Sequence, residues 1–93
     1  MTKYKILVSK TAVSQLNSLD AITKERIRSG MRPLEENPFQ RRSGADIKKL
    51  VLSTEPPLYR LRVGDYRVIY CVVEEEVKVT EIIHRSKGYK WLE

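Results

Sequence analysis

The chain has very few of the residues that build disulfides, metal sites or membrane spans. Cys71 and His84 are its only cysteine and its only histidine among 93 residues. A single cysteine excludes an internal disulfide and a cysteine-only zinc site, and a single histidine excludes a multi-histidine metal site. No stretch reaches the ~20 apolar residues of a membrane span, and the N-terminus lacks the apolar run of a signal peptide. We therefore expect one cytoplasmic domain over residues 1–93, with no metal, no cofactor and no membrane contact.

The charge of the chain is strongly one-sided. Lysine and arginine number 18 against 12 aspartate and glutamate residues, which gives a formal net charge of +6 and a pI near 9.6. The hydrophobic fraction of 41% is enough for a packed core, so this charge sits on a folded domain. A basic domain of this size is typical of proteins that bind a polyanion, such as nucleic acid, an anionic membrane or an acidic protein. The alternative is that the charge serves solubility alone.

Hydrophobic periodicity predicts one strand, two helices and then four strands. Ser9 and Asp20 are suitable N-caps for the helices, which are expected over 9–19 and from position 20 to before position 37. Gly30 and Pro33 weaken the second helix, so it either kinks or restarts as a short turn at Pro33. The expected strands are 3–8, 47–52, 58–63, 66–73 and 77–84. The side chains expected to face inward are Ala12, Val13, Leu16 and Leu19 on the first helix and Ile22, Ile27, Met31 and Leu34 on the second. Helices followed by strands favour an α+β fold, with the helices on one face of a mostly antiparallel sheet.

Two alternating stretches around a central glycine predict a hairpin whose two faces differ. Gly64 stands first in a two-residue turn, where a type II′ hairpin needs a positive φ. The register then places Val63, Leu61 and Tyr59 opposite Tyr66, Val68 and Tyr70 on an apolar face under the helices. It places Arg62 opposite Arg67 on the uncovered face, which also carries Arg60. Like charges across a strand pair cost roughly 0.2–1 kcal/mol, so we infer that this face holds an anion.

The candidates for chemistry are mostly cations. They are Arg60, Arg62, Arg67, Lys48, Lys49, His84, Arg85 and Tyr89. Several arginine forks can hold a phosphate and stabilise negative charge in a transition state. RNA supplies its own nucleophile, the 2′-hydroxyl, so a protein has to align it, take its proton and protonate the leaving oxygen. His84 is the first candidate for proton exchange, followed by Tyr89 or a lysine, because arginine holds its proton.

Each of these residues also has a structural interpretation. The arginines fit a solvated sheet face, and His84 fits a structural contact at a strand end. Tyr89 and Trp91 fit an attachment of the tail to the core. Cys71 lies in an apolar run, which favours a packing role over a nucleophile paired with His84.

The hairpin stretch L-Y-R-L-R-V-G-D-Y-R-V-I-Y, from Leu58 to Tyr70, resembles the central hairpin of toxins of the RelE/ParE superfamily. The segment 34–38 and the pair at 49–50 match the helix end and second strand of that family. The segment 83–89 is similar to its end motif, a histidine–arginine pair with a tyrosine four residues after the arginine. The resemblance covers almost the whole chain, and it implies the family's microbial-ribonuclease-like α+β fold.

The RelE branch of this superfamily implies a ribosome-dependent endoribonuclease that cuts mRNA in the A site without metal. Such a toxin is neutralised by a small RelB-like antitoxin. The resemblance implies a catalytic set of Arg62, Arg67, Arg85, Tyr89 and His84, and RNA contacts from Arg60, Lys48 and Lys49. Within that set the hairpin arginines grip the phosphate, and the tyrosine stacks on a base or orients the nucleophile. Two alternatives stay open: a ParE-type inhibitor of DNA gyrase without catalysis, and a non-toxic RNA-binding domain.

Overall fold

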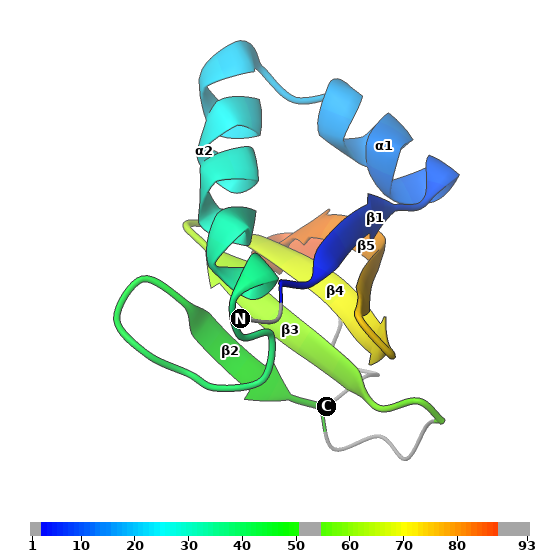
Figure 1. The fold of residues 1–93 in the computed structure, drawn as a ribbon. Helices are drawn as coiled ribbons and strands as arrows, with labels where there is room; N and C mark the ends of the chain where they lie inside the picture. Colours follow the sequence, from blue (N-terminus) through cyan, green and yellow to red (C-terminus); the bar gives the residue numbers. More distant parts are fainter. Residues whose placement is uncertain (1–2, 51–54, 88–93) are drawn as a thin grey trace.

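The computed structural model describes residues 3–50 and 55–87, and it has the expected α+β architecture. The elements are β1 (Lys5–Val8), α1 (Lys10–Asn17), α2 (Ala21–Met31), a 3₁₀ turn η1 (Arg32–Glu35), β2 (Asp46–Lys49), β3 (Leu58–Val63), β4 (Tyr66–Val73), β5 (Glu76–His84) and a 3₁₀ turn η2 (Arg85–Lys87). The strands form one sheet in the order β1-β5-β4-β3-β2. Every pair is antiparallel except β1 and β5, which are parallel. Figure 1 shows both helices on the same face of this sheet.

Capping side chains fix where the two helices begin. The Ser9 hydroxyl accepts the N–H of Ala12 at 3.1 Å, and the Asp20 carboxylate accepts the N–H of Thr23 at 3.1 Å. Hydrogen bonds with Thr23 also hold the pKa of Asp20 below its ordinary value, because they favour the ionised carboxylate. At the other end of α2, the chain tightens into η1, with Pro33 in its first turn. A short turn is therefore confirmed here, and it begins at Arg32, one residue before Pro33.

The core lies between the helices and the sheet. Its buried members are Ala12, Leu16, Ile27, Met31, Leu34, Ala45, Ile47, Leu61, Val68, Tyr70, Val77, Val79 and Ile82. The apolar face expected for the hairpin is confirmed, since Tyr59, Val63 and Tyr66 pack against this cluster. Two inward predictions were wrong: Val13 is 41% exposed and Ile22 is 72% exposed, so both side chains lie on the outer surfaces of their helices.

The observed element bounds are close to those expected. β1 begins at Lys5 rather than at position 3, and β5 begins one residue early, at Glu76. β2 begins at Asp46 and ends at Lys49, and the expected positions 51–52 lie outside the described residues. Within the described part of the chain, no helix is long and apolar enough to cross a membrane.

Candidate functional site: the arginine face and the hairpin tip

The β3–β4 hairpin has the register that the sequence predicts. Arg62 pairs with Arg67, and Val63 pairs with Tyr66 next to the turn. Gly64 has a φ of +58°, and Asp65 does not share a positive φ, which fits a type II′ turn. The Arg67 guanidinium donates to the Gly64 carbonyl at 3.1 Å and to the Tyr66 carbonyl at 3.0 Å. The turn therefore holds one arginine of the facing pair close to the hairpin tip, which we define as residues 63–66.

Cross-strand pairing defines the residues of the face turned away from the helices, which we call the arginine face. Side chains that are directly opposite on neighbouring strands share a face. One row across the sheet is Asp46, Arg62, Arg67 and Ile83, and the next row is Lys48, Arg60, Ile69 and Glu81. Lys48 thus joins the three hairpin arginines, whereas Lys49 pairs with Tyr59 on the face toward the helices. The arginine face therefore carries four cations and two carboxylates from its two rows.

Arg60 differs from its neighbours because its side chain is only 12% exposed. One terminal nitrogen lies 3.3 Å from both the side-chain carboxylate and the main-chain carbonyl of Asp46. The Nε atom is buried and has no hydrogen-bond partner among the described residues. Asp46 is also 3.5 Å from the Nε of the exposed Arg41. Of the two β3 arginines on this face, Arg62 is therefore exposed to solvent, whereas Arg60 is largely buried against Asp46.

The arginine face also has an apolar part that sequence reasoning missed. Leu50 and Ile69 are each 2% exposed, and they pack with the half-buried Leu58 and Ile83. The sequence does contain a signal for this apolar part, because the run V-I-Y-C-V-V in β4 is apolar at consecutive positions. Such a run marks a strand that is buried on both faces. The cations of this face are therefore set beside a small second core.

His84 and Arg85 lie at the tip from the end of β5. His84 pairs with Tyr66, and their rings meet edge-on with centroids 5.1 Å apart. The His84 Nδ1 accepts the backbone N–H of Ser86 at 3.1 Å and lies 2.8 Å from its hydroxyl. A neutral ring in this arrangement carries its proton on Nε2. The pairing also puts His84 on the helix-side face, beside the tip and not among the arginines.

The backbone of Arg85 is tied to the turn of the hairpin. Its N–H donates to the Asp65 carbonyl at 2.8 Å, and its Nε lies 3.5 Å from the Asp65 carboxylate. Both side chains are more than half exposed. The structure therefore gathers Arg62 and Arg67 on one face and brings Arg85 and His84 to the tip. Tyr89 lies outside the described residues, so its place in this set stays a prediction.

The geometry limits the other chemistry that the described residues could support. Cys71 pairs with Lys78 near the opposite end of the β4–β5 ladder from His84, so the two do not form a nucleophile pair. No group of three or more His, Cys, Asp or Glu side chains that could hold a metal ion occurs within 3–50 and 55–87. What the arrangement offers is a pair of facing guanidinium groups, a third at the tip and a ring N–H. Such a set suits binding a phosphate and stabilising charge that develops on it.

Solved structures of similar shape include toxins in complex with antitoxins. The chain superposes with a TM-score of 0.76 on the archaeal RelE–RelB complex from Pyrococcus horikoshii, with 34% identity over 95% of this chain and 100% of the other. The RelB–RelE complex from Methanococcus jannaschii gives 0.69 and 25% identity over 94% and 99% of the two chains. The RelBE2 complex from Mycobacterium tuberculosis, at 20% identity and a TM-score of 0.68, shares the fold.

The sequence itself also matches a protein family. Residues 6–89 match the family described as ParE toxin of the type II toxin–antitoxin system parDE. This match spans most of the chain, and it agrees with the hairpin register and with the architecture of the RelE proteins. The chain belongs to the RelE/ParE superfamily of toxins of type II toxin–antitoxin systems.

Proposed function

We propose that this toxin is of the RelE type, a ribosome-dependent endoribonuclease that cuts mRNA in the A site and so inhibits translation. One observation carries the proposal: Arg62 and Arg67 are direct cross-strand neighbours on the face that the helices leave open, beside a tip that carries Arg85. Facing cations repel each other in the absence of an anion, and a phosphate between them removes that repulsion. The RelE names of the similar solved complexes support the same branch.

The proposed reaction uses the 2′-hydroxyl of the RNA as the nucleophile. The 2′-oxygen attacks the neighbouring phosphorus, its proton passes to a base, and the bond to the 5′-oxygen breaks as that oxygen gains a proton. Arg62 and Arg67 stabilise the charge that builds on the phosphate oxygens. His84 donates a hydrogen bond from Nε2, because Ser86 occupies Nδ1. His84 stays our first candidate for the proton exchange and Tyr89 the next, since the arginines cannot lose a proton at neutral pH.

Dependence on the ribosome follows from the scarcity of proton-transfer groups. A site made mainly of guanidinium groups stabilises charge but aligns a flexible RNA strand poorly by itself. Alignment by a second macromolecule can lower a barrier by about 7–11 kcal/mol. We therefore propose that a programmed ribosome with an open A site supplies the alignment. Cleavage should then need no metal of its own and should survive a chelator once the ribosomes have been fixed.

The test is primer extension on one message, with and without ribosomes. We expect cleavage on ribosomes and little on free RNA, and we expect Arg62→Ala/Arg67→Ala to cleave at least about 100-fold more slowly. Arg28→Ala is the matched control, because Arg28 is an exposed arginine on the outer side of α2. Equal cutting of naked RNA would sink the dependence on ribosomes, and full activity of the double variant would place the site elsewhere.

A second function is favoured by one observation, the match to the ParE toxin family over residues 6–89. Under this alternative the chain binds DNA gyrase and performs no chemistry. Inhibition of gyrase-catalysed DNA supercoiling by the purified protein, together with no mRNA cleavage on ribosomes, would favour it. A protein that binds RNA but does neither would be the non-toxic RNA-binding domain.

We also propose a RelB-like antitoxin as the partner of this chain. The similar structures are RelB–RelE complexes, and the net charge of +6 favours an acidic partner over the arginine face. The two edge strands of the sheet, β1 and β2, offer backbone groups that an added chain can pair with. Co-purification with the product of the neighbouring reading frame tests this partner directly.

A further inference from the structure

Four aromatic rings form a continuous row from the core to the surface, on the helix-side face of the sheet. Tyr70 is fully buried and stacks on Tyr59 with centroids 5.6 Å apart. Tyr59 meets Phe39 at 5.6 Å, and Phe39 meets Tyr4 at 6.0 Å, both edge to face. Phe39 is 46% exposed. The row therefore includes one ring, Phe39, that offers much of its surface to solvent, and we call Phe39 with Tyr59 the aromatic platform.

The loop that carries Phe39 is braced from several sides. The Asn37 side-chain oxygen accepts the N–H of Phe39 at 2.9 Å and that of Gln40 at 3.2 Å. Arg42 donates to the carbonyls of Asn37 and Gln40 at 3.0 and 2.7 Å. The buried Tyr70 hydroxyl donates to the Pro38 carbonyl at 2.7 Å. The exposed ring is therefore held in place before any ligand arrives, which reduces the ordering entropy that binding would require.

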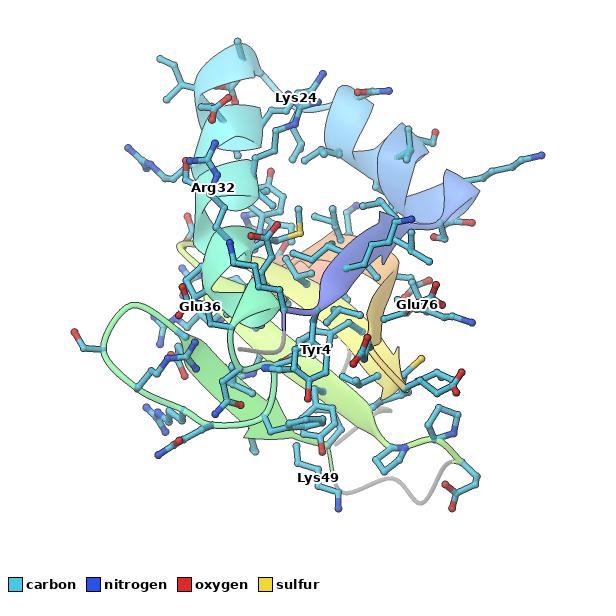
Figure 2. The ribbon with its side chains drawn as sticks, in the orientation of Figure 1. Tyr4, Lys24, Arg32, Glu36, Lys49 and Glu76 are labelled. Carbon is cyan, nitrogen blue, oxygen red and sulfur yellow. The ribbon has the colours of Figure 1, made fainter. Side chains whose placement is uncertain are left out.

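Two adjacent lysines at the edge strand β2 lie on opposite faces of the sheet, one on the arginine face and one on the side of the aromatic platform. Successive side chains of a strand point to opposite faces. Lys48 accordingly lies opposite Arg60 on the arginine face, and Lys49 lies opposite Tyr59 on the platform side. Both lysines are exposed. Figure 1 shows β2 at one edge of the sheet, and Figure 2 labels Lys49 near the end of this strand.

We propose that the aromatic platform stacks a base of single-stranded RNA that also crosses the arginine face, at a nucleotide outside the cleavage point. The proposal rests on the proposed function for its ligand class. An exposed ring packed on Tyr59, whose cross-strand neighbour is Lys49, fits a nucleic-acid strand, whose bases stack while its phosphates meet cations. The two adjacent exposed lysines at the end of β2 favour RNA over an apolar peptide. The platform thus lengthens the RNA contact from one phosphate to a stretch of strand.

The experiment measures stacking directly with a single-stranded RNA oligonucleotide that contains 2-aminopurine, whose fluorescence falls when it stacks. With the wild-type protein we expect quenching and saturable binding. Phe39→Leu keeps the apolar volume but removes the ring, so we expect lost quenching and roughly tenfold weaker binding. Phe39→Tyr keeps the ring and should retain both. Ile22→Ala is the matched control, because Ile22 is an exposed apolar side chain on the outside of α2.

Several outcomes separate this inference from the proposed function. Unchanged quenching and affinity for Phe39→Leu, or no binding by the wild-type protein, overturns the platform. A loss in Phe39→Leu without any cleavage on ribosomes supports the platform and overturns the ribonuclease proposal. If Phe39→Leu weakens only the complex with the neighbouring antitoxin, the surface belongs to a protein partner and the inference fails. Urea midpoints of all four proteins exclude a loss of folding as the cause.

Discussion

Arg60 and Arg62 lie on the same strand but differ in burial and in ion pairing. Arg60 and Arg62 are two positions apart in β3 and share a face, but only Arg60 is buried against a carboxylate. A buried guanidinium without its partner is strongly destabilising, whereas an exposed one is solvated by water. We therefore assign Arg60 first to the stability of the β2–β3 pair. We propose that Arg62 carries the binding role, and any RNA contact of Arg60 has to leave its ion pair with Asp46 intact.

Removing Asp46 should therefore destabilise the protein measurably. We expect Asp46→Ala to lower the free energy of unfolding by about 1–3 kcal/mol, because it leaves a buried donor unsatisfied. Asp65→Ala removes an ion pair whose two side chains are mostly exposed, and it should cost at most about 1 kcal/mol. Urea denaturation of the two variants checks the difference. Equal losses would mean that Arg60 is solvated after all.

Tyr70 gives the protein a specific sensitivity to alkaline pH. Burial raises the pKa of Tyr70 above its ordinary value of about 10, so the folded protein keeps a proton that the unfolded chain releases. This contribution is complete below pH 10 and is lost as the pH rises toward the folded-state pKa, at up to ~1.4 kcal/mol per pH unit. Tyr70→Phe should flatten that decline. Unfolding curves from pH 7 to pH 11 test it.

Tyr70→Phe also has a cost at neutral pH. The hydroxyl donates to the Pro38 carbonyl, and its removal leaves a buried acceptor without that donor. We expect a loss of about 1–2 kcal/mol in the free energy of unfolding at pH 7. A variant as stable as the wild type would show that water replaces the hydroxyl.

At the scale of elements, α2 meets the sheet where Gly30 lies against Val63. A Cβ on Gly30 would stand 2.8 Å from one methyl group of Val63, which is closer than real Cβ atoms come. Valine is stiff at χ1, so it cannot turn away easily. The glycine that weakens the helix on propensity grounds is thus the residue that lets helix and hairpin approach.

The close contact between Gly30 and Val63 predicts that the effect of Gly30→Ala on the free energy of unfolding changes sign when Val63 is shortened. Gly30→Ala should destabilise the wild-type protein by about 1–2 kcal/mol, because overpacking outweighs the better helix propensity. With Val63→Ala in the background, the same substitution should stabilise by up to about 1 kcal/mol. The four free energies of unfolding form a double-mutant cycle. Additive effects would show that the two elements are not in close contact at this point.

The hairpin was predictable from the sequence because its determinants are local. Period-two alternation and Gly64 sufficed for the register, including the facing of Arg62 and Arg67. The partner of Arg60 was not predictable, because Asp46 comes from a strand 14 positions away. The face of the sheet on which His84 lies was not predictable. The pairing of β4 with β5 shifts by one residue between Ile69 and Tyr70, and this shift changes which β5 residues share a face with a given β4 residue. Ile22 was misplaced because it lies five positions before the buried Ile27, which at 3.6 residues per turn puts it about 140° away round the helix.

At the scale of the whole molecule, the net charge of +6 should make the affinity for an acidic partner depend on the salt concentration. Exposed charges attract an acidic chain over about 10 Å at 0.1 M salt and over a shorter range at higher salt. We expect the affinity for the antitoxin to fall roughly tenfold or more between 50 mM and 500 mM salt. Isothermal titration at several salt concentrations measures it. An affinity that does not respond to salt would indicate a mainly apolar interface.

The parallel pairing of β1 with β5 has a consequence for the way the protein is made. β1 and α1 leave the ribosome first, but β1 finds its neighbour only in β5, where Lys5 pairs with Glu76 and the Ser9 hydroxyl donates to the Thr80 carbonyl at 3.0 Å. A nascent chain that stops before β5 lacks the strand that joins β1 to the rest of the sheet, and it lacks His84 and Arg85 at the tip. If the proposed site is the active one, we expect such an incomplete chain to be unable to cut messages, so that a message cut ahead of β5 yields no new toxin.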